Sequence, residues 1–183
     1  ADWDLRNVGS QEVTLEIDGG DEEVVTLTET EVSLGVFTGE ILVQNTAAIP
    51  GDGVLQAQDG QSILARYLDA DDGLGNTDQW RQATSQADFS PPVVLDVQVQ
   101  VRGVTATINL LTDEPALAEI RYSAISGGPY DLAESETQLS ELHGIDVSGL
   151  NTQTNYYFIV ALTDAAGNQT LADDAGQPYS FKT

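Results

Sequence analysis

The sequence contains no cysteine and no methionine, and it has a single histidine, His143, and a single lysine, Lys182. Without cysteine there is no disulfide framework, no thiol nucleophile and no thiolate metal site. An extracellular location stays open, because apolar burial alone can stabilise a β-sandwich. No apolar run reaches the roughly 18 residues of a transmembrane helix. The absence of a signal peptide and of an initiator methionine predicts a processed product or a segment of a longer chain.

Basic residues are also scarce. Six lysines and arginines stand against 30 aspartates and glutamates, and the formal net charge is -24. A surface of this kind repels phosphate backbones and anionic lipids, so we expect neither nucleic-acid binding nor membrane insertion. It also attracts cations and keeps a chain soluble in salt. The excess of acidic over basic residues therefore indicates a secreted protein or a saline environment.

The pattern of apolar residues predicts an all-β fold of two tandem β-sandwich modules. Of the 183 residues, 40% are hydrophobic, enough for two small cores. Apolar and polar residues alternate with period two, and Gly, Asp and Asn clusters interrupt the pattern every 8–12 residues or so. In the first half the predicted strands are Glu12–Ile17, Glu23–Thr30, Gly35–Gln44, Gly53–Ala57 and Gln61–Leu68. The turns between them hold glycines that suit positive φ, at Gly19, Gly51, Gly53 and Gly60.

A polar stretch followed by two prolines predicts the domain boundary. Residues 69–88 contain few apolar side chains, and Ser90-Pro91-Pro92 follows. Consecutive prolines stiffen the chain and cannot donate ladder hydrogen bonds. We therefore predict one module over residues 1–89 and a second over residues 90–183.

The second half has a clearer strand pattern. In Val93–Arg102, Leu95, Val97, Val99 and Val101 alternate with polar residues, which predicts a strand with one buried face. Further strands are predicted at Ala106–Thr112, Ala118–Ser123, His143–Val147, Tyr156–Thr163 and Tyr179–Lys182, with room for a seventh in Tyr130–Gln138. About seven strands over some 90 residues are typical of an Ig-like or fibronectin-like sandwich.

Several motifs of this half resemble a bacterial fibronectin type III domain, of the variety that precedes the catalytic domain in purple acid phosphatases. They are Pro91-Pro92-Val93-Val94, Thr105-Ala106-Thr107-Ile108, Thr112-Asp113-Glu114-Pro115-Ala116, Glu119-Ile120-Arg121-Tyr122, Ser148-Gly149-Leu150 with Thr154-Asn155-Tyr156-Tyr157-Phe158, and Leu162-Thr163-Asp164-Ala165-Ala166-Gly167-Asn168. The resemblance implies a fibronectin type III sandwich without catalytic residues, because that family's metal ligands belong to another domain. One departure is Leu110, where the family usually has a tryptophan.

Two positions of the resemblance have a physical reason. Tyr156, six residues after Leu150, can bury its ring while its hydroxyl bonds to nearby backbone and locks the crossover between sheets. Asp164, four residues before Asn168, ends a strand, and its side-chain oxygens can accept turn amides. We favour this turn role for Asp164 over metal binding.

The first half is similar, more weakly, to a β-rich repeat of large bacterial surface proteins. The residues that carry this are Thr26-Leu27-Thr28-Glu29-Thr30, Gly35-Val36-Phe37-Thr38-Gly39, Asp52-Gly53-Val54-Leu55, Asp59-Gly60-Gln61-Ser62-Ile63 and Tyr67-Leu68-Asp69. The resemblance implies display outside the cell and extension of a longer chain.

The densest acidic segment offers a calcium site. Closely spaced oxygens with glycines between them can wrap a hard cation that takes six to eight oxygen ligands. The candidate metal ligands are Asp69, Asp71, Asp72, Asn76 and Asp78. The segment is not an EF-hand, because Gly73 replaces the third acidic ligand and no glutamate stands at the twelfth position. The alternative is a solvated acidic loop.

No constellation predicts catalysis. His143 shares its strand parity with Ile145 and Val147, which favours a structural position over a metal or triad role. We therefore expect a non-enzymatic structural module of a bacterial surface or extracellular assembly, acting as a spacer, stalk or filament subunit. The alternative is an adhesin or carbohydrate-binding accessory module of a secreted enzyme, for which Trp3 and Trp80 are the candidate platforms. The expected partners are other proteins, neighbouring modules or further copies of the chain that pair through edge strands. Residues 1–10 are a candidate for a detached terminal strand that adds to the sheet of a neighbour.

Overall fold

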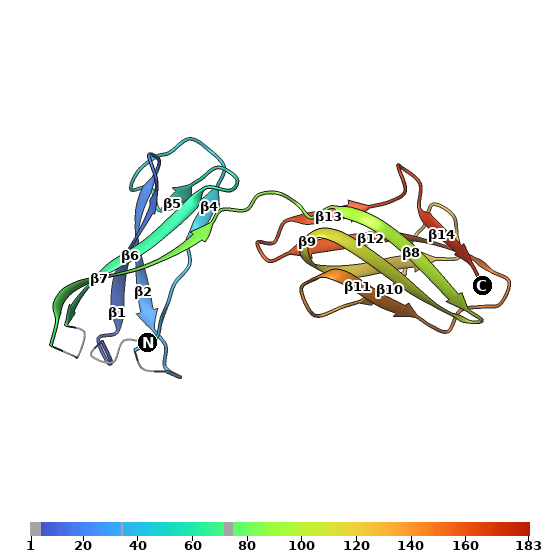
Figure 1. The fold of residues 1–183 in the computed structure, drawn as a ribbon, viewed down its shortest axis with the longest axis horizontal. Coiled ribbons are helices and arrows are strands. Elements are labelled where there is room, and N and C mark those ends of the chain that lie inside the picture. The colour runs from blue at the N-terminus through green and yellow to red at the C-terminus, as the bar shows by residue number, and fades with distance from the viewer. Residues whose placement is uncertain (1–4, 34, 72–74) are drawn as a thin grey trace. The chain divides into compact units, whose positions relative to one another are not determined.

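A computed structural model describes residues 5–33, 35–71 and 75–183. The chain divides into two compact units, Ala1–Phe89 and Ser90–Thr183, and each is described by itself. The described residues form strands and turns and contain no helix, so the prediction of an all-β fold is confirmed (Figure 1). Accordingly, no helix that could cross a membrane occurs among them.

The first unit is built on a five-stranded antiparallel sheet in the order β3-β2-β1-β6-β7. A separate parallel pair, β4 with β5, completes it. The strands are β1 (Ser10–Ile17), β2 (Glu22–Glu29), β3 (Phe37–Thr38), β4 (Leu42–Gln44), β5 (Val54–Gln56), β6 (Ser62–Asp71) and β7 (Thr77–Gln86). The predicted strand Gly35–Gln44 is thus wrong in detail, since it consists of two short strands in different sheets.

The core of the first unit lies at one end of its sheet. Leu15 and Ile17 alternate with polar residues along β1, and both pack with Ile63 of β6 against Leu55 and Ala57. Ile41 and Val43 close the same cluster. This core is small because β7 contributes nothing to it: every residue of β7 is exposed. The sequence analysis predicted no strand after Leu68 in this half, whereas main-chain pairing with β6 makes Thr77–Gln86 a strand.

The second unit is a two-layered β-sandwich. Its strands are β8 (Val94–Arg102), β9 (Thr105–Ser123), β10 (Leu132–Ser135), β11 (Ser140–Val147), β12 (Asn155–Asp164), β13 (Gln169–Ala172) and β14 (Tyr179–Lys182). The first part of β9 pairs with β8 and β11, and its second part pairs with β10 and β12. β13 and β14 pair with opposite ends of β12. One continuous strand, β9, therefore supplies a member to each layer (Figure 1).

Both layers contribute to the core of the second unit. Ile108 and Leu110 come from the first part of β9, and Ile120, Phe158 and Val160 come from the other layer. These side chains are at most 3% exposed. Leu110, the one departure from the family resemblance, is buried here like its neighbours.

The register of β8 differs from the predicted alternation. A bulge between Val94 and Asp96 shifts its parity against β9. As a result Val94, Val97 and Val99 pack against the core, while Leu95 is exposed. Val101 shares the parity of Val97 and Val99 but is exposed near the end of the strand. A β-bulge places an extra residue in one strand, and no apolar pattern reveals it in advance.

The corner between the layers has the predicted tyrosine. Tyr156 is 4% exposed, and its ring packs against Tyr122 and Phe181. The backbone N–H of Asn151 donates a hydrogen bond to the Tyr156 hydroxyl at 2.9 Å. Leu150, at the other end of the corner, is buried as well. The predicted role of Tyr156 is confirmed.

Candidate functional site

The predicted calcium ligands lie at the end of the β6–β7 hairpin. Asp69 and Asp71 belong to β6, Asp78 belongs to β7, and Asn76 precedes β7. Asp72 lies outside the described residues. Asp71, Asn76 and Asp78 are exposed, and Asp78 has a positive φ of 55°. The structure therefore places four of the five predicted ligands on one hairpin, but it does not bring their oxygens together as a described cluster.

Asp69 differs from the other members of this group. Its side chain is 0% exposed, and its Oδ2 accepts a hydrogen bond from Arg81 Nε at 3.0 Å. Its Oδ1 is buried and has no hydrogen-bond partner among the described residues. A buried carboxylate oxygen without a partner is costly, because it has lost water and gained nothing in return. Asp69 Oδ1 is thus the atom of the hairpin with the greatest need of a ligand.

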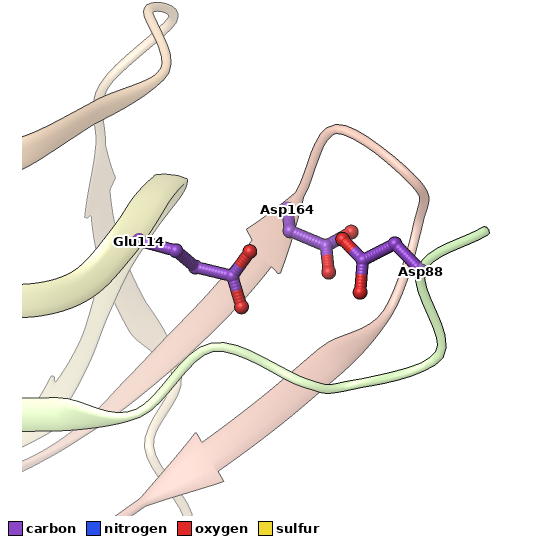
Figure 2. Close-up of side chains that lie close together, drawn as sticks. All are labelled: Asp88, Glu114 and Asp164. Carbon is purple, nitrogen blue, oxygen red and sulfur yellow. The ribbon is translucent and has the colours of Figure 1, made fainter. Parts of the chain in front are cut away.

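A second group of carboxylates was missed by the sequence analysis. Within the second unit, a ligand oxygen of Glu114 and one of Asp164 lie within 4.8 Å of each other (Figure 2). Glu114 lies in β9 and Asp164 ends β12. Their wide separation along the chain gave no spacing signal.

The buried member of this group already has a structural task. Oδ1 of Asp164 accepts a hydrogen bond from the Asn168 backbone N–H at 2.8 Å, and its Oδ2 accepts one from Asn168 Nδ2 at 2.9 Å. These bonds close the turn between β12 and β13, so the predicted turn role of Asp164 is confirmed. Since the turn explains the burial of Asp164, we assign no ligand to this group.

His143 lies in an arrangement that resembles a catalytic triad in outline. Its Nδ1 is 2.9 Å from Glu136 Oε2, and its Nε2 is 3.5 Å from Thr112 Oγ1. The Thr112 hydroxyl, however, donates to the backbone carbonyl of Glu114 at 2.7 Å, so its proton is directed away from the imidazole. Thr112 and His143 are both buried, out of reach of a substrate. The predicted structural position of His143, in one row with Ile145, is confirmed.

An exposed patch crosses three strands of the first unit. Trp80 of β7 is 60% exposed and lies opposite Leu68 of β6. The Arg66 guanidinium carbon is 5.4 Å from the centre of the Trp80 ring, and Arg66 Nη2 is 2.9 Å from Glu16 Oε2 on β1. A cation held over an indole face is a favourable contact, which orients the ring at the surface. The patch combines an aromatic surface with polar groups, whereas Trp3 lies outside the described residues.

Comparisons with known proteins give no family. No family model matches the chain, and no curated protein matches it either. Among solved structures, the chain is similar to a protein of Bacteroides uniformis ATCC 8492 described as a "putative carbohydrate binding protein", at 11% identity and a TM-score of 0.34. The match covers 97% of this chain and 90% of that chain. A TM-score this low supports neither a shared topology nor a shared function.

Proposed function

We propose that the chain is a non-enzymatic structural module of a bacterial extracellular or cell-surface assembly, serving as a spacer, stalk or filament subunit. The main support is the use of its buried polar side chains. Glu23, Asp164 and His143 are buried, and each is engaged with turns or neighbouring strands. Groups that act on a substrate converge on an accessible cavity instead.

Glu23 illustrates this use of a carboxylate. Its Oε1 accepts hydrogen bonds from the backbone N–H groups of Gly51 at 2.6 Å and Asp52 at 3.0 Å. Its Oε2 accepts a third from Gly53 at 3.1 Å. A carboxylate that accepts three N–H hydrogen bonds links two segments of the chain strongly, since hydrogen bonds to a charged acceptor are about twice as strong as neutral ones. The loop before β5 is thereby tied to β2.

The strand order of the second unit supports the proposal that it is a fibronectin type III-like module. Three strands, β8, β11 and the first part of β9, face four, namely β10, the second part of β9, β12 and the β13/β14 pair. The tyrosine corner at Tyr156 is a recurrent feature of such sandwiches. For the first unit we keep the proposal of a surface-protein repeat, which rests on its sequence motifs.

The proposed location can be tested directly. Antibodies raised against the chain should label intact cells of the producing organism, and external protease should remove the label. Permeabilised cells, with an internal protein as marker, serve as the control. Labelling that requires permeabilisation would contradict an extracellular role.

A second candidate function is carbohydrate binding, which the exposed face of Trp80 favours. An indole presents a flat apolar surface that can stack on the C–H groups of a sugar ring, and Arg66, Glu16 and Gln82 on the same sheet face can hydrogen-bond hydroxyls. The test is co-sedimentation of the full chain with insoluble polysaccharides. Trp80→Ala should abolish binding and Trp80→Phe should retain part of it. If neither variant differs from the original chain, the patch does not bind sugar.

We also propose that calcium stabilises the β6–β7 hairpin. The support is the buried, partnerless Oδ1 of Asp69 together with the acidic and amide side chains of Asp71, Asn76 and Asp78 on the same hairpin. Oxygen ligands of these types suit calcium. Arg81 already neutralises part of the charge of Asp69, so an ion here needs the exposed carboxylates as well.

A further inference from the structure

The sheet edges of the described strands differ greatly in length and regularity. β3 has two residues, and β10, β13 and β14 have four each. β8 is interrupted by the bulge after Val94, and β11 has a register shift between Ser140 and Leu142. Short, bulged edges are the usual protection against pairing with another chain. β7 lacks this protection.

β7 is a long and regular edge. It has ten residues, it ends the five-stranded sheet, and it pairs with β6 alone among the described strands. Its register with β6 runs without a break from Ser62↔Gln86 to Asp69↔Gln79. Every residue of β7 is exposed. The outer main-chain groups of such a strand form a ready template for another strand.

The side chains of β7 carry no net charge, so the strand itself adds no repulsion between two copies of the chain. The chain as a whole has a net charge of -24, so copies of it repel one another. The sequence of β7, TDQWRQATSQ, has one acidic residue, Asp78, and one basic residue, Arg81, and so no net charge. It contains no proline, glycine or lysine, which are the residues that commonly block edges. β7 is a neutral strip on an acidic molecule.

We propose that β7 pairs in antiparallel fashion with β7 of a second copy of this chain, centred on Gln82. In an antiparallel pair, directly opposed residues point to the same face of the sheet. In a two-fold symmetric pair of β7 strands, even-numbered residues therefore lie opposite even-numbered ones and odd-numbered residues opposite odd-numbered ones. The two most complete registers are centred on Arg81 and on Gln82. The first sets Arg81 against the partner's Arg81, which is repulsive. The second sets Trp80 against the partner's Thr84 and brings no two charged residues opposite each other.

This inference rests on the proposed structural role and deepens it, because it names the contact by which one subunit meets another. It joins two five-stranded sheets into one continuous sheet. Trp80 would then lie beside the new junction, where the partner's Thr84 covers part of its exposed ring. The contact is two-fold symmetric and closes on itself, so by this edge alone it gives dimers.

The absence of cysteine gives a direct test of the register. The full chain with Gln82→Cys should form a disulfide-linked dimer under mild oxidation, because directly opposed strand positions lie within the Cα distance of a disulfide. Gln138→Cys, on an exposed turn of the second unit, is the matched control and should cross-link only slowly. Equal cross-linking rates for the two variants would overturn the proposal. So would a chain that sediments as a monomer at all concentrations or pairs only with a different protein.

A lysine at the same position separates strand pairing from general charge effects. Gln82→Lys lowers the net negative charge of the chain, so simple repulsion predicts a tighter dimer. Strand pairing centred on Gln82 instead sets two lysines face to face and raises the dissociation constant by up to about fivefold. Gln138→Lys makes the same charge change away from the edge and should not weaken the dimer. Sedimentation equilibrium measures both, and circular dichroism confirms that each variant folds.

The two proposals fail separately. A monomeric chain that is labelled on intact cells would overturn self-pairing and leave the structural role standing. A dimeric chain that is found only inside cells would overturn the extracellular structural role and leave self-pairing standing.

Discussion

The tyrosine corner offers the sharpest test of how the second unit is held together. Tyr156→Phe removes the hydroxyl that accepts the Asn151 N–H at 2.9 Å and leaves the buried ring and its contacts in place. No cavity is created, so the loss is that of one hydrogen bond. Because Asn151 is exposed, water can reach its freed N–H and limit the cost. We expect a loss of about 1–1.5 kcal/mol in the free energy of unfolding.

The two units carry different chromophores, which makes the effect measurable in the full chain. Trp3 and Trp80 both belong to the first unit, whereas every tyrosine except Tyr67 belongs to the second. A loss of about 1 kcal/mol lowers the melting temperature of a domain of this size by roughly 4–8 °C. Near-ultraviolet circular dichroism of tyrosine should therefore show an earlier transition. The melt followed by tryptophan fluorescence should not move.

Tyr157→Phe is the matched control. Tyr157 is the next residue of β12, points to the opposite face and is only partly buried. Its variant should change stability by less than about 0.5 kcal/mol. Equal shifts for Tyr156→Phe and Tyr157→Phe, or no shift for either, would refute the role given to the hydroxyl.

Three further predictions concern the carboxylates of the first unit. Glu23→Gln weakens three bonds to backbone N–H groups and should cost about 1.5–3 kcal/mol, seen as a lower urea midpoint by tryptophan fluorescence. For Glu29, chiefly the hydrogen bond from Gly35 N–H lowers the pKa below its ordinary value of about 4.5. Its stabilisation is complete above that value and lost as the pH falls through the lower folded pKa, so Glu29→Gln should flatten the acid limb of the urea midpoint plotted against pH. Calcium at a hundredfold excess over its dissociation constant should add about 2.7 kcal/mol relative to chelator in a tryptophan-detected melt, an effect that Asp69→Asn removes and Asp164→Asn retains.

The strands that could be predicted from the sequence are those that bury apolar side chains. In β12, Tyr156, Phe158, Val160 and Leu162 alternate with less buried residues, and the pattern alone locates the strand. The turn at Asp164 was also predictable, because a short acidic side chain at a strand end has few other roles.

What the sequence did not reveal depends on main-chain pairing and on contacts between distant residues. β7 and β13 are polar or short, and they are strands because β6 and β12 offer them a ladder. Because of the bulge after Val94, Leu95 does not point to the buried face that its alternation with Val97 predicts, and the composition of β8 does not reveal this. The proximity of Glu114 and Asp164 follows from the pairing of β9 with β12, which no local pattern encodes.

The carboxylates of this acidic chain have a structural role, because several of them accept hydrogen bonds from backbone N–H groups. With six basic residues for 30 acidic ones, most carboxylates have no cationic side chain available. Backbone N–H groups take that place: Glu29 accepts from Asn7, Gly9 and Gly35, Asp59 accepts from Phe89, and Asp113 accepts from Val93. Such bonds do not need a counter-ion and are shielded by salt less than surface ion pairs are. A chain that ties its loops in this way can therefore keep a strongly repulsive surface and still hold its turns. In the self-pairing proposed above, the neutral edge of β7 is where two such surfaces meet.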